Sequence, residues 1–212
     1  MTIPAGVLSI LALLSAAATI GADVRKKFGL VYIFKPLTMV LIVALAAIGR
    51  QTGTPRYKYC VLAGLVFSLG GDVFMMLRRK RFLEGLACFF TAHLFFIAAF
   101  LSHRPGSVNV GLLLPFGTYL GFMTGILWTR LGRMKVPVVL YMLVLTAMAV
   151  LAAERYHLGL GGGAVYALLG SILFVVSDSL LAANRFIREF RPAQILILGS
   201  YFAAQWLIAL SV

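Results

Sequence analysis

Two aspartates lie at the ends of long apolar runs, where an ionisable side chain is unusual. Asp72 closes the run GLVFSLGGD and Asp178 closes the run GSILFVVSD. An ionisable residue inside a membrane span costs about 2.5–3.5 kcal/mol at the centre on insertion scales, and by default it marks a functional site. Two carboxylates in such a setting can give and take protons. We therefore treat Asp72 and Asp178 as candidate catalytic residues.

Other polar residues accompany the aspartates inside apolar runs. Lys35 precedes Pro36 near the start of one run, and Tyr201 and Gln205 share one helical face at i and i+4. Lys35 has three open interpretations: a counter-ion to an aspartate, a ligand of a lipid phosphate, or a side chain that extends to the headgroups. His93 falls on an aromatic stripe that also contains Phe82, Gly85, Phe89 and Phe96.

Each of these residues also has a purely structural interpretation. The stripe around His93 is equally typical of aromatic helix packing. The aspartates could extend toward Arg79 and Arg185, each seven residues further on. Glu84 is most simply a helix-end residue that pairs with the basic cluster Arg78–Arg81.

The composition requires that these residues be positioned within a membrane. Of the 212 residues, 62% are hydrophobic and 12% are charged, against about 45–50% and about 25% in soluble proteins. A water-soluble globule is excluded because too few polar residues are present to cover it. We predict an all-α, polytopic transmembrane helix bundle.

Runs of about 20 apolar residues, enough to cross the hydrocarbon core, recur eight times. We expect one transmembrane domain over residues 1–212, in which the first run is retained rather than cleaved as a signal peptide. The eight expected spans lie near 3–22, 30–49, 57–77, 82–101, 108–129, 136–152, 160–183 and 193–212.

The net charge of +13 is concentrated in the connectors between spans. The first, third, fifth and seventh connectors hold 13 Lys and Arg residues, and the even connectors hold 5. By the positive-inside rule the odd connectors face the cytoplasm and both termini lie outside it. The basic residues then contact anionic lipid headgroups rather than nucleic acid, which we do not expect as a partner.

This orientation places the polar residues in layers. Asp72, Asp178 and Lys35 share a depth in the cytoplasmic half of the membrane, and His93 and Tyr201 lie deeper. The context of Asp72, which follows Gly64 by eight positions and precedes Phe82, resembles that of Asp178 between Gly170 and Phe186. This similarity indicates a possible 4+4 internal duplication that would bring two equivalent carboxylates to one axis.

Several other chemistries find no support in the sequence. The three histidines lack metal-ligand spacing, so we expect no metal site and no cofactor. Cys60 and Cys88 lie inside apolar runs and are interpreted as packing residues. Gly161–Gly163 lacks a nucleotide-binding pattern, and no G-x-S-x-G motif is present.

Taken together, the motifs resemble those of a known family of membrane proteins over nearly the whole chain. The chain resembles the YhhN-type lysoplasmalogenase family of eight-span membrane proteins in the Lys35-Pro36 pair and in the segments GGDVFMML, RFLEGLACFFTAHLFFIAAF, SILFVVSDSLLAANRF and SYFAAQWLI. The resemblance implies hydrolysis of the vinyl-ether bond of lysoplasmalogens. The products would be a fatty aldehyde and glycerophosphoethanolamine or glycerophosphocholine.

The candidate residues suit this reaction. Vinyl-ether hydrolysis begins with protonation of the β-carbon and passes through an oxocarbenium ion that water captures. A protonated carboxyl and a carboxylate are needed, and two aspartates in a low-dielectric site can supply both, because desolvation and mutual repulsion keep one protonated. Which aspartate is the acid stays open. We expect the lysophospholipid to contact the residues Lys35, His93, Asn184, Tyr201 and Gln205.

Two other functions remain as alternatives. A small transporter or proton-coupled channel would use Asp72 and Asp178 as relays and the duplicated halves as moving parts. A receptor-like bundle or scaffold would leave the two buried aspartates without a role. We favour the enzyme, located as a multi-pass protein in a bacterial inner membrane among membrane lipids; the sequence does not define its oligomeric state.

Overall fold

The computed structural model describes residues 3–49, 54–77, 81–103 and 109–212, and within these ranges the chain is all-α. The predicted fold class is confirmed: the described residues contain eight helices long and apolar enough to cross a membrane. They are α1 (Ile3–Val24), α2 (Phe28–Ile48), α3 (Pro55–Met76), α4 (Phe82–Phe100), α5 (Val110–Trp128), α6 (Lys135–His157), α7 (Ala164–Ala182) and α8 (Ala193–Leu210).

Local sequence signals explain where several helices begin and end. Thr54 caps α3 by accepting a hydrogen bond from the Tyr57 backbone, and Pro55 occupies the first helical turn, where a missing N–H costs nothing. α6 continues to His157, five residues beyond the expected span. It continues because Glu154 and Arg155 are buried: Glu154 accepts a hydrogen bond from the Asn109 backbone, and Arg155 lies over the Tyr57 ring.

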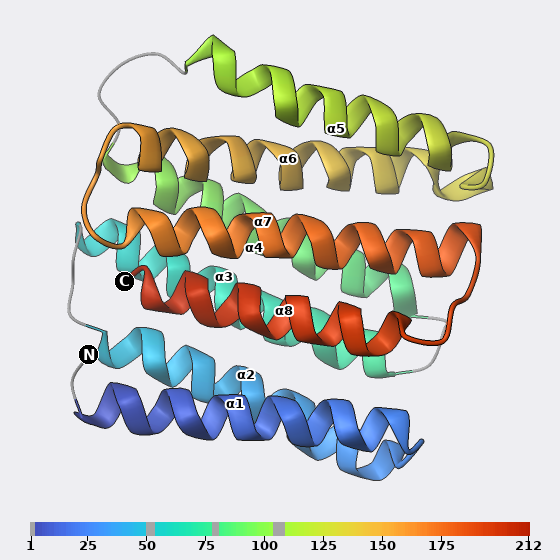
Figure 1. The fold of residues 1–212 in the computed structure, drawn as a ribbon, viewed down its shortest axis with the longest axis horizontal. Coiled ribbons are helices and arrows are strands. Elements are labelled where there is room, and N and C mark those ends of the chain that lie inside the picture. Colours follow the sequence, from blue (N-terminus) through green and yellow to red (C-terminus); the bar gives the residue numbers. More distant parts are fainter. Residues whose placement is uncertain (1–2, 50–53, 78–80, 104–108) are drawn as a thin grey trace.

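The helices run antiparallel in sequence order and form an elongated bundle (Figure 1). Seven of them form a closed ring in which each helix packs against the next, in the order α1, α2, α3, α4, α6, α7, α8 and back to α1. α5 lies outside this ring and packs mainly on α6, at the edge of the bundle opposite α1 (Figure 1).

Helix packing repeats between the two halves of the chain. The contacts of α1 with α2, α2 with α3 and α3 with α4 recur between α5 and α6, α6 and α7, and α7 and α8. The contact of α4 with α6 recurs as that of α8 with α2. This pattern is the one that a two-fold axis along the membrane normal would produce, and it agrees with the suggested duplication.

The repeated glycines explain the closest helix pairs. A Cβ atom on Gly64 would lie 2.4 Å from the Phe96 ring of α4, and one on Gly170 would lie 2.9 Å from the Ala204 carbonyl oxygen of α8. Only glycine permits these approaches. A glycine at the equivalent position of each half therefore allows close packing, of α4 against α3 and of α8 against α7. Each glycine lies about two turns before the aspartate of its helix.

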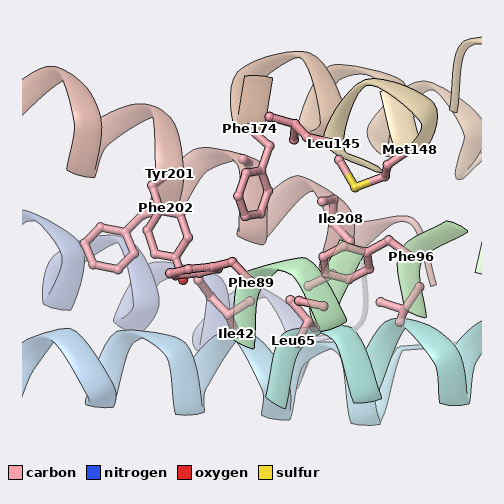
Figure 2. Packing of buried hydrophobic residues seen from close by; sticks show 14 of the residues in the cluster. Ile42, Leu65, Phe89, Phe96, Leu145, Met148, Phe174, Tyr201, Phe202 and Ile208 are labelled. Atoms are coloured by element: carbon pink, nitrogen blue, oxygen red, sulfur yellow. The ribbon is translucent and has the colours of Figure 1, made fainter. Parts of the chain in front are cut away.

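Aromatic rings fill the centre of the ring of helices. Phe89, Phe174 and Tyr201, from three different helices, meet edge to face with centroids 5.7–6.3 Å apart. Figure 2 shows these rings among the buried aliphatic side chains. Such packing holds neighbouring polar side chains in fixed positions.

α1, α3, α5 and α7 finish at one end of the bundle, opposite the start of α1 and the end of α8 (Figure 1). We call this the basic end, because it carries Arg25, Lys26, Lys27, Arg81, Arg130, Arg133, Lys135, Arg188 and Arg191. Arg78, Arg79 and Lys80 of the third connector, and Arg50 and Arg104 of the even connectors, lie outside the described residues. That the basic end faces the cytoplasm stays a prediction.

Candidate active site

Asp72 is held by two side chains from other helices. Its Oδ1 lies 2.9 Å from Lys35 Nζ on α2, and its Oδ2 accepts a hydrogen bond of 2.6 Å from the Tyr201 hydroxyl on α8. Asp72 is buried, and the Lys35 ammonium supplies the opposite charge that such burial requires. Both carboxyl oxygens of Asp72 are therefore engaged, one by an ammonium group and one by a phenol hydroxyl.

Asp178 has a different set of partners. The Tyr141 hydroxyl on α6 donates to Asp178 Oδ2, and His93 Nε2 on α4 lies 2.9 Å from the same hydroxyl and 3.8 Å from Oδ2. Because Tyr141 has one hydroxyl hydrogen and donates it to Asp178, its oxygen accepts from His93 Nε2–H. The result is a buried chain from imidazole through phenol to carboxyl.

The two aspartate environments are equivalent in the helices that build them. α2, α3 and α8 provide Lys35, Asp72 and Tyr201, and α6, α7 and α4, their counterparts in the other half, provide Tyr141, Asp178 and His93. Tyr141 is separated from Lys35 by the same number of positions that separates Asp178 from Asp72. The halves thus hold two similar carboxyl sites, one beside a lysine and one beside a tyrosine and a histidine.

Both aspartates line one open cavity of ≈ 1160 Å³, a volume that includes the space at its mouth. Lys35, Tyr201 and Phe89 contribute to the same wall. The lining extends to Asp23, Phe28 and Gln194 at helix ends. The cavity therefore opens at the basic end, where a charged headgroup can be accommodated.

A second, apolar cavity continues from Asp178 toward α5 and α6, and its volume of ≈ 550 Å³ includes the open space at its mouth. It shares Met75, Phe82, Phe89 and Arg185 with the open cavity, and Leu86, Met142 and Leu145 line its deeper part. Its wall is formed mostly by apolar side chains. The two cavities together form a polar chamber with an apolar extension, and Asp178 lies where they meet.

The structure brings together most, but not all, of the residues singled out from sequence. Lys35 and Tyr201 contact Asp72, and His93 lies beside Asp178. Asn184 does not line either cavity; its Oδ1 accepts a hydrogen bond from the Phe190 backbone where α7 ends in a π-helical turn. Gln205 is completely buried one turn beyond Tyr201, away from the cavity wall.

Glu84 pairs with the basic cluster, as its structural interpretation predicted: its carboxylate lies 3.2 Å from the Arg81 guanidinium near the bundle surface. Extension of Asp72 toward the headgroups is contradicted by its burial against Lys35. The guanidinium of Arg185 lies 3.7 Å from the centroid of the Phe82 ring, at the junction of the two cavities. In the described parts of the chain, no three His, Cys, Asp or Glu side chains gather as a metal site.

Two residues of the site were not selected from sequence. Tyr141 lies in an apolar run, where a tyrosine is unremarkable, and only its spacing from Lys35 matched the repeat of the aspartates. Arg185 was considered only as a partner for Asp178. The structure places it in the walls of both cavities.

Comparison with known proteins places the chain among named membrane proteins. The sequence model that defines the YhhN family matches residues 30–212 of this chain. The uncharacterized membrane protein YhhN of Escherichia coli O6:H1 is 30% identical over 198 residues, which cover 93% of this chain and 94% of that protein.

Two mammalian relatives carry names that specify an activity. The human lysoplasmalogenase TMEM86B is 34% identical over 157 residues, covering 73% of this chain and 64% of that protein. The pig lysoplasmalogenase TMEM86B is 32% identical over 174 residues, covering 81% and 70%. No solved structure matches this chain.

Proposed function

The chain belongs to the YhhN family, and we propose that this membrane protein is a hydrolase that cleaves the vinyl-ether bond of lysoplasmalogens. Relatives named lysoplasmalogenase support the reaction class. The observation that carries the proposal is the pair of unlike aspartates on one cavity: Asp72 is paired with Lys35, and Asp178 is hydrogen-bonded to Tyr141. This reaction needs one carboxylate and one carboxylic acid.

The shape and charge of the cavities suit a lysolipid with a single chain. The apolar extension past Asp178 accommodates the alkenyl chain, and the open chamber at the basic end accommodates the glycerophospho headgroup. Arg185, at the junction, and Lys35, in the chamber wall, provide positive charge for the phosphate. The vinyl-ether group, between chain and headgroup, then lies between the two aspartates.

We assign the role of general acid to Asp178. Lys35 lies 2.9 Å from Asp72 and favours its ionised form, whereas the hydrogen-bond partner of Asp178 is the Tyr141 hydroxyl, which contacts His93 in turn. Protonated Asp178 transfers its proton to the β-carbon of the vinyl ether. The α-carbon becomes an oxocarbenium ion, and the nearby Asp72 carboxylate stabilises it.

Water completes the reaction. Its oxygen bonds to the α-carbon while Asp72 takes one of its protons, which gives a hemiacetal. Transfer of the hemiacetal hydroxyl proton to the glycerol oxygen breaks the C–O bond and releases aldehyde and glycerophosphodiester. Asp72 returns its proton to solvent through the open chamber, and the His93–Tyr141 chain can reprotonate Asp178.

Purified protein in detergent, supplied with a lysoplasmalogen, tests the proposal. We expect free aldehyde and an equal amount of glycerophosphodiester. In D₂O the aldehyde should carry one deuterium on the carbon next to the carbonyl. In ¹⁸O-labelled water the glycerophosphodiester should contain no ¹⁸O, because the bond between the glycerol oxygen and the α-carbon breaks. A preparation that forms no aldehyde but carries protons across vesicles would instead support the transporter.

A further inference from the structure

A groove of ≈ 740 Å³ lies between α5 and α7. Phe116 and Tyr119 of α5 line it on one side, and Ile172, Val175, Val176 and Ser179 of α7 line it on the other. Apart from the two hydroxyl groups its lining is apolar. Its residues lie within the spans, so the groove opens to the hydrocarbon of the bilayer rather than to water.

A polar contact lies in the wall shared by this groove and the apolar cavity at Asp178. Tyr119 and Ser179 line both spaces, and their hydroxyl oxygens lie 2.7 Å apart. Ser179 donates to the Val175 carbonyl oxygen, so the Tyr119 hydroxyl donates to Ser179. Ser179 follows Asp178 directly. Rotation of the Tyr119 side chain would therefore join the bilayer to the catalytic cavity.

The packing of α5 allows such an opening. Of the residues in α5, Met123 and Leu127, in its half nearer the basic end, are buried, and the part facing the groove is not. α1, the counterpart of α5 in the other half, packs against both α2 and α8. Among the described residues α5 has extensive packing only against α6. α5 is therefore held by fewer neighbouring helices than α1.

We propose that this groove is a lateral portal, through which the hydrocarbon chain of the substrate passes from the bilayer to Asp178, and that the Tyr119–Ser179 hydrogen bond closes it. The proposal rests on the proposed function. A lysolipid that enters sideways keeps its chain in hydrocarbon throughout, whereas entry through the open chamber would draw the chain past charged groups and water. The apolar lining and the continuity with the catalytic cavity favour a lipid chain as occupant.

Obstruction of the groove tests the portal. Val176→Trp places a large side chain in the groove on α7, and Leu114→Trp adds the same bulk to an exposed position of α5 outside the groove lining. Two substrates are compared in nanodiscs: a lysoplasmalogen with a long alkenyl chain, and a water-soluble analogue whose alkenyl chain has two carbons. We expect Val176→Trp to lower kcat/KM for the long chain by at least about tenfold and to spare the soluble analogue, whereas Leu114→Trp changes neither.

Unchanged hydrolysis of the long chain by Val176→Trp would overturn the portal, and so would an equal loss for both substrates. A binding readout separates this failure from that of the proposed function. A non-cleavable alkyl lysophospholipid with a diazirine in mid-chain is photo-crosslinked to wild-type protein, with and without excess unlabelled lipid. Saturable adducts on Phe116 or on residues 172–180, absent in Val176→Trp, support the portal even if no aldehyde forms. Adducts that excess lipid does not reduce would overturn it.

Discussion

Lys35 Nζ lies 2.9 Å from Asp72 Oδ1, in an ion pair whose side chains are only 12% and 2% exposed. Removing one member of a buried ion pair typically costs about 3–5 kcal/mol, because the other charge is left uncompensated. We therefore expect Lys35→Met to lower the thermal stability of the protein in detergent, together with at least about a hundredfold loss of turnover.

The double variant Lys35→Met/Asp72→Asn separates the two effects. It removes both charges, so it should recover most of the lost stability while remaining inactive. Thermal unfolding and aldehyde release, measured on the same preparations, check this. A Lys35→Met variant with wild-type stability would show that Asp72 does not need its counter-ion.

Tyr141→Phe tests the chain that leads to Asp178. Loss of the hydroxyl removes the hydrogen bonds that link His93 to the carboxyl group and leaves the aromatic ring in place. We expect kcat to fall by about tenfold to a hundredfold, with little change in KM and an altered dependence of kcat on pH. Tyr59→Phe, at an exposed position of α3, is the matched control. If both variants retain full kcat, the proton chain has no role.

Gly170→Ala tests the close approach of α7 and α8. The added methyl group would meet the Ala204 carbonyl oxygen and the Ile208 side chain, so the helices must separate. Overpacking of this kind costs about 1–3 kcal/mol. Gly117→Ala, where a Cβ atom meets nothing within 4 Å, should be neutral or slightly stabilising. Thermal unfolding of the two variants gives the comparison, and equal midpoints would contradict the packing argument.

The fold was predictable because a lipid bilayer permits few backbone structures. Runs of apolar residues long enough to cross the bilayer must be helices, since each backbone group needs an internal partner. The aspartates and Lys35 were identifiable for the same reason: a charge is conspicuous in an apolar run. Their arrangement around one cavity was suggested by the repeated Gly and Asp positions.

The rest of the site could not be derived from residue types. Tyr141 and Tyr119 are ordinary residues in apolar spans, and their roles depend on which neighbour each hydroxyl meets. Asn184 was expected to contact substrate, but the π-helical turn at the end of α7 directs its side chain to the Phe190 backbone. α5 packs mainly on one helix, whereas α1 packs on two. This difference depends on the sum of many weak contacts and cannot be predicted from a single sequence motif.

The membrane orientation remains to be measured. The excess of Lys and Arg at the basic end predicts that this end faces the cytoplasm, with both termini outside. Reporters inserted in the connector at Gly132 and in the connector at Gly161 should show cytoplasmic and external locations, respectively. The reverse result would move the mouth of the open cavity, and the headgroup site, to the outer leaflet.

The central claim is that Asp72 and Asp178 act together on one transition state, and the turnover of their isosteric variants tests it most directly. Asp72→Asn and Asp178→Asn, purified as assembled protein, should each hydrolyse lysoplasmalogen at least about 10²-fold more slowly than wild type. The double variant should be little worse than the slower single variant, because groups that act as a unit are not additive. Glu84→Gln, whose carboxylate pairs with Arg81 near the surface, should retain most activity. Near wild-type turnover in either aspartate variant would contradict the account.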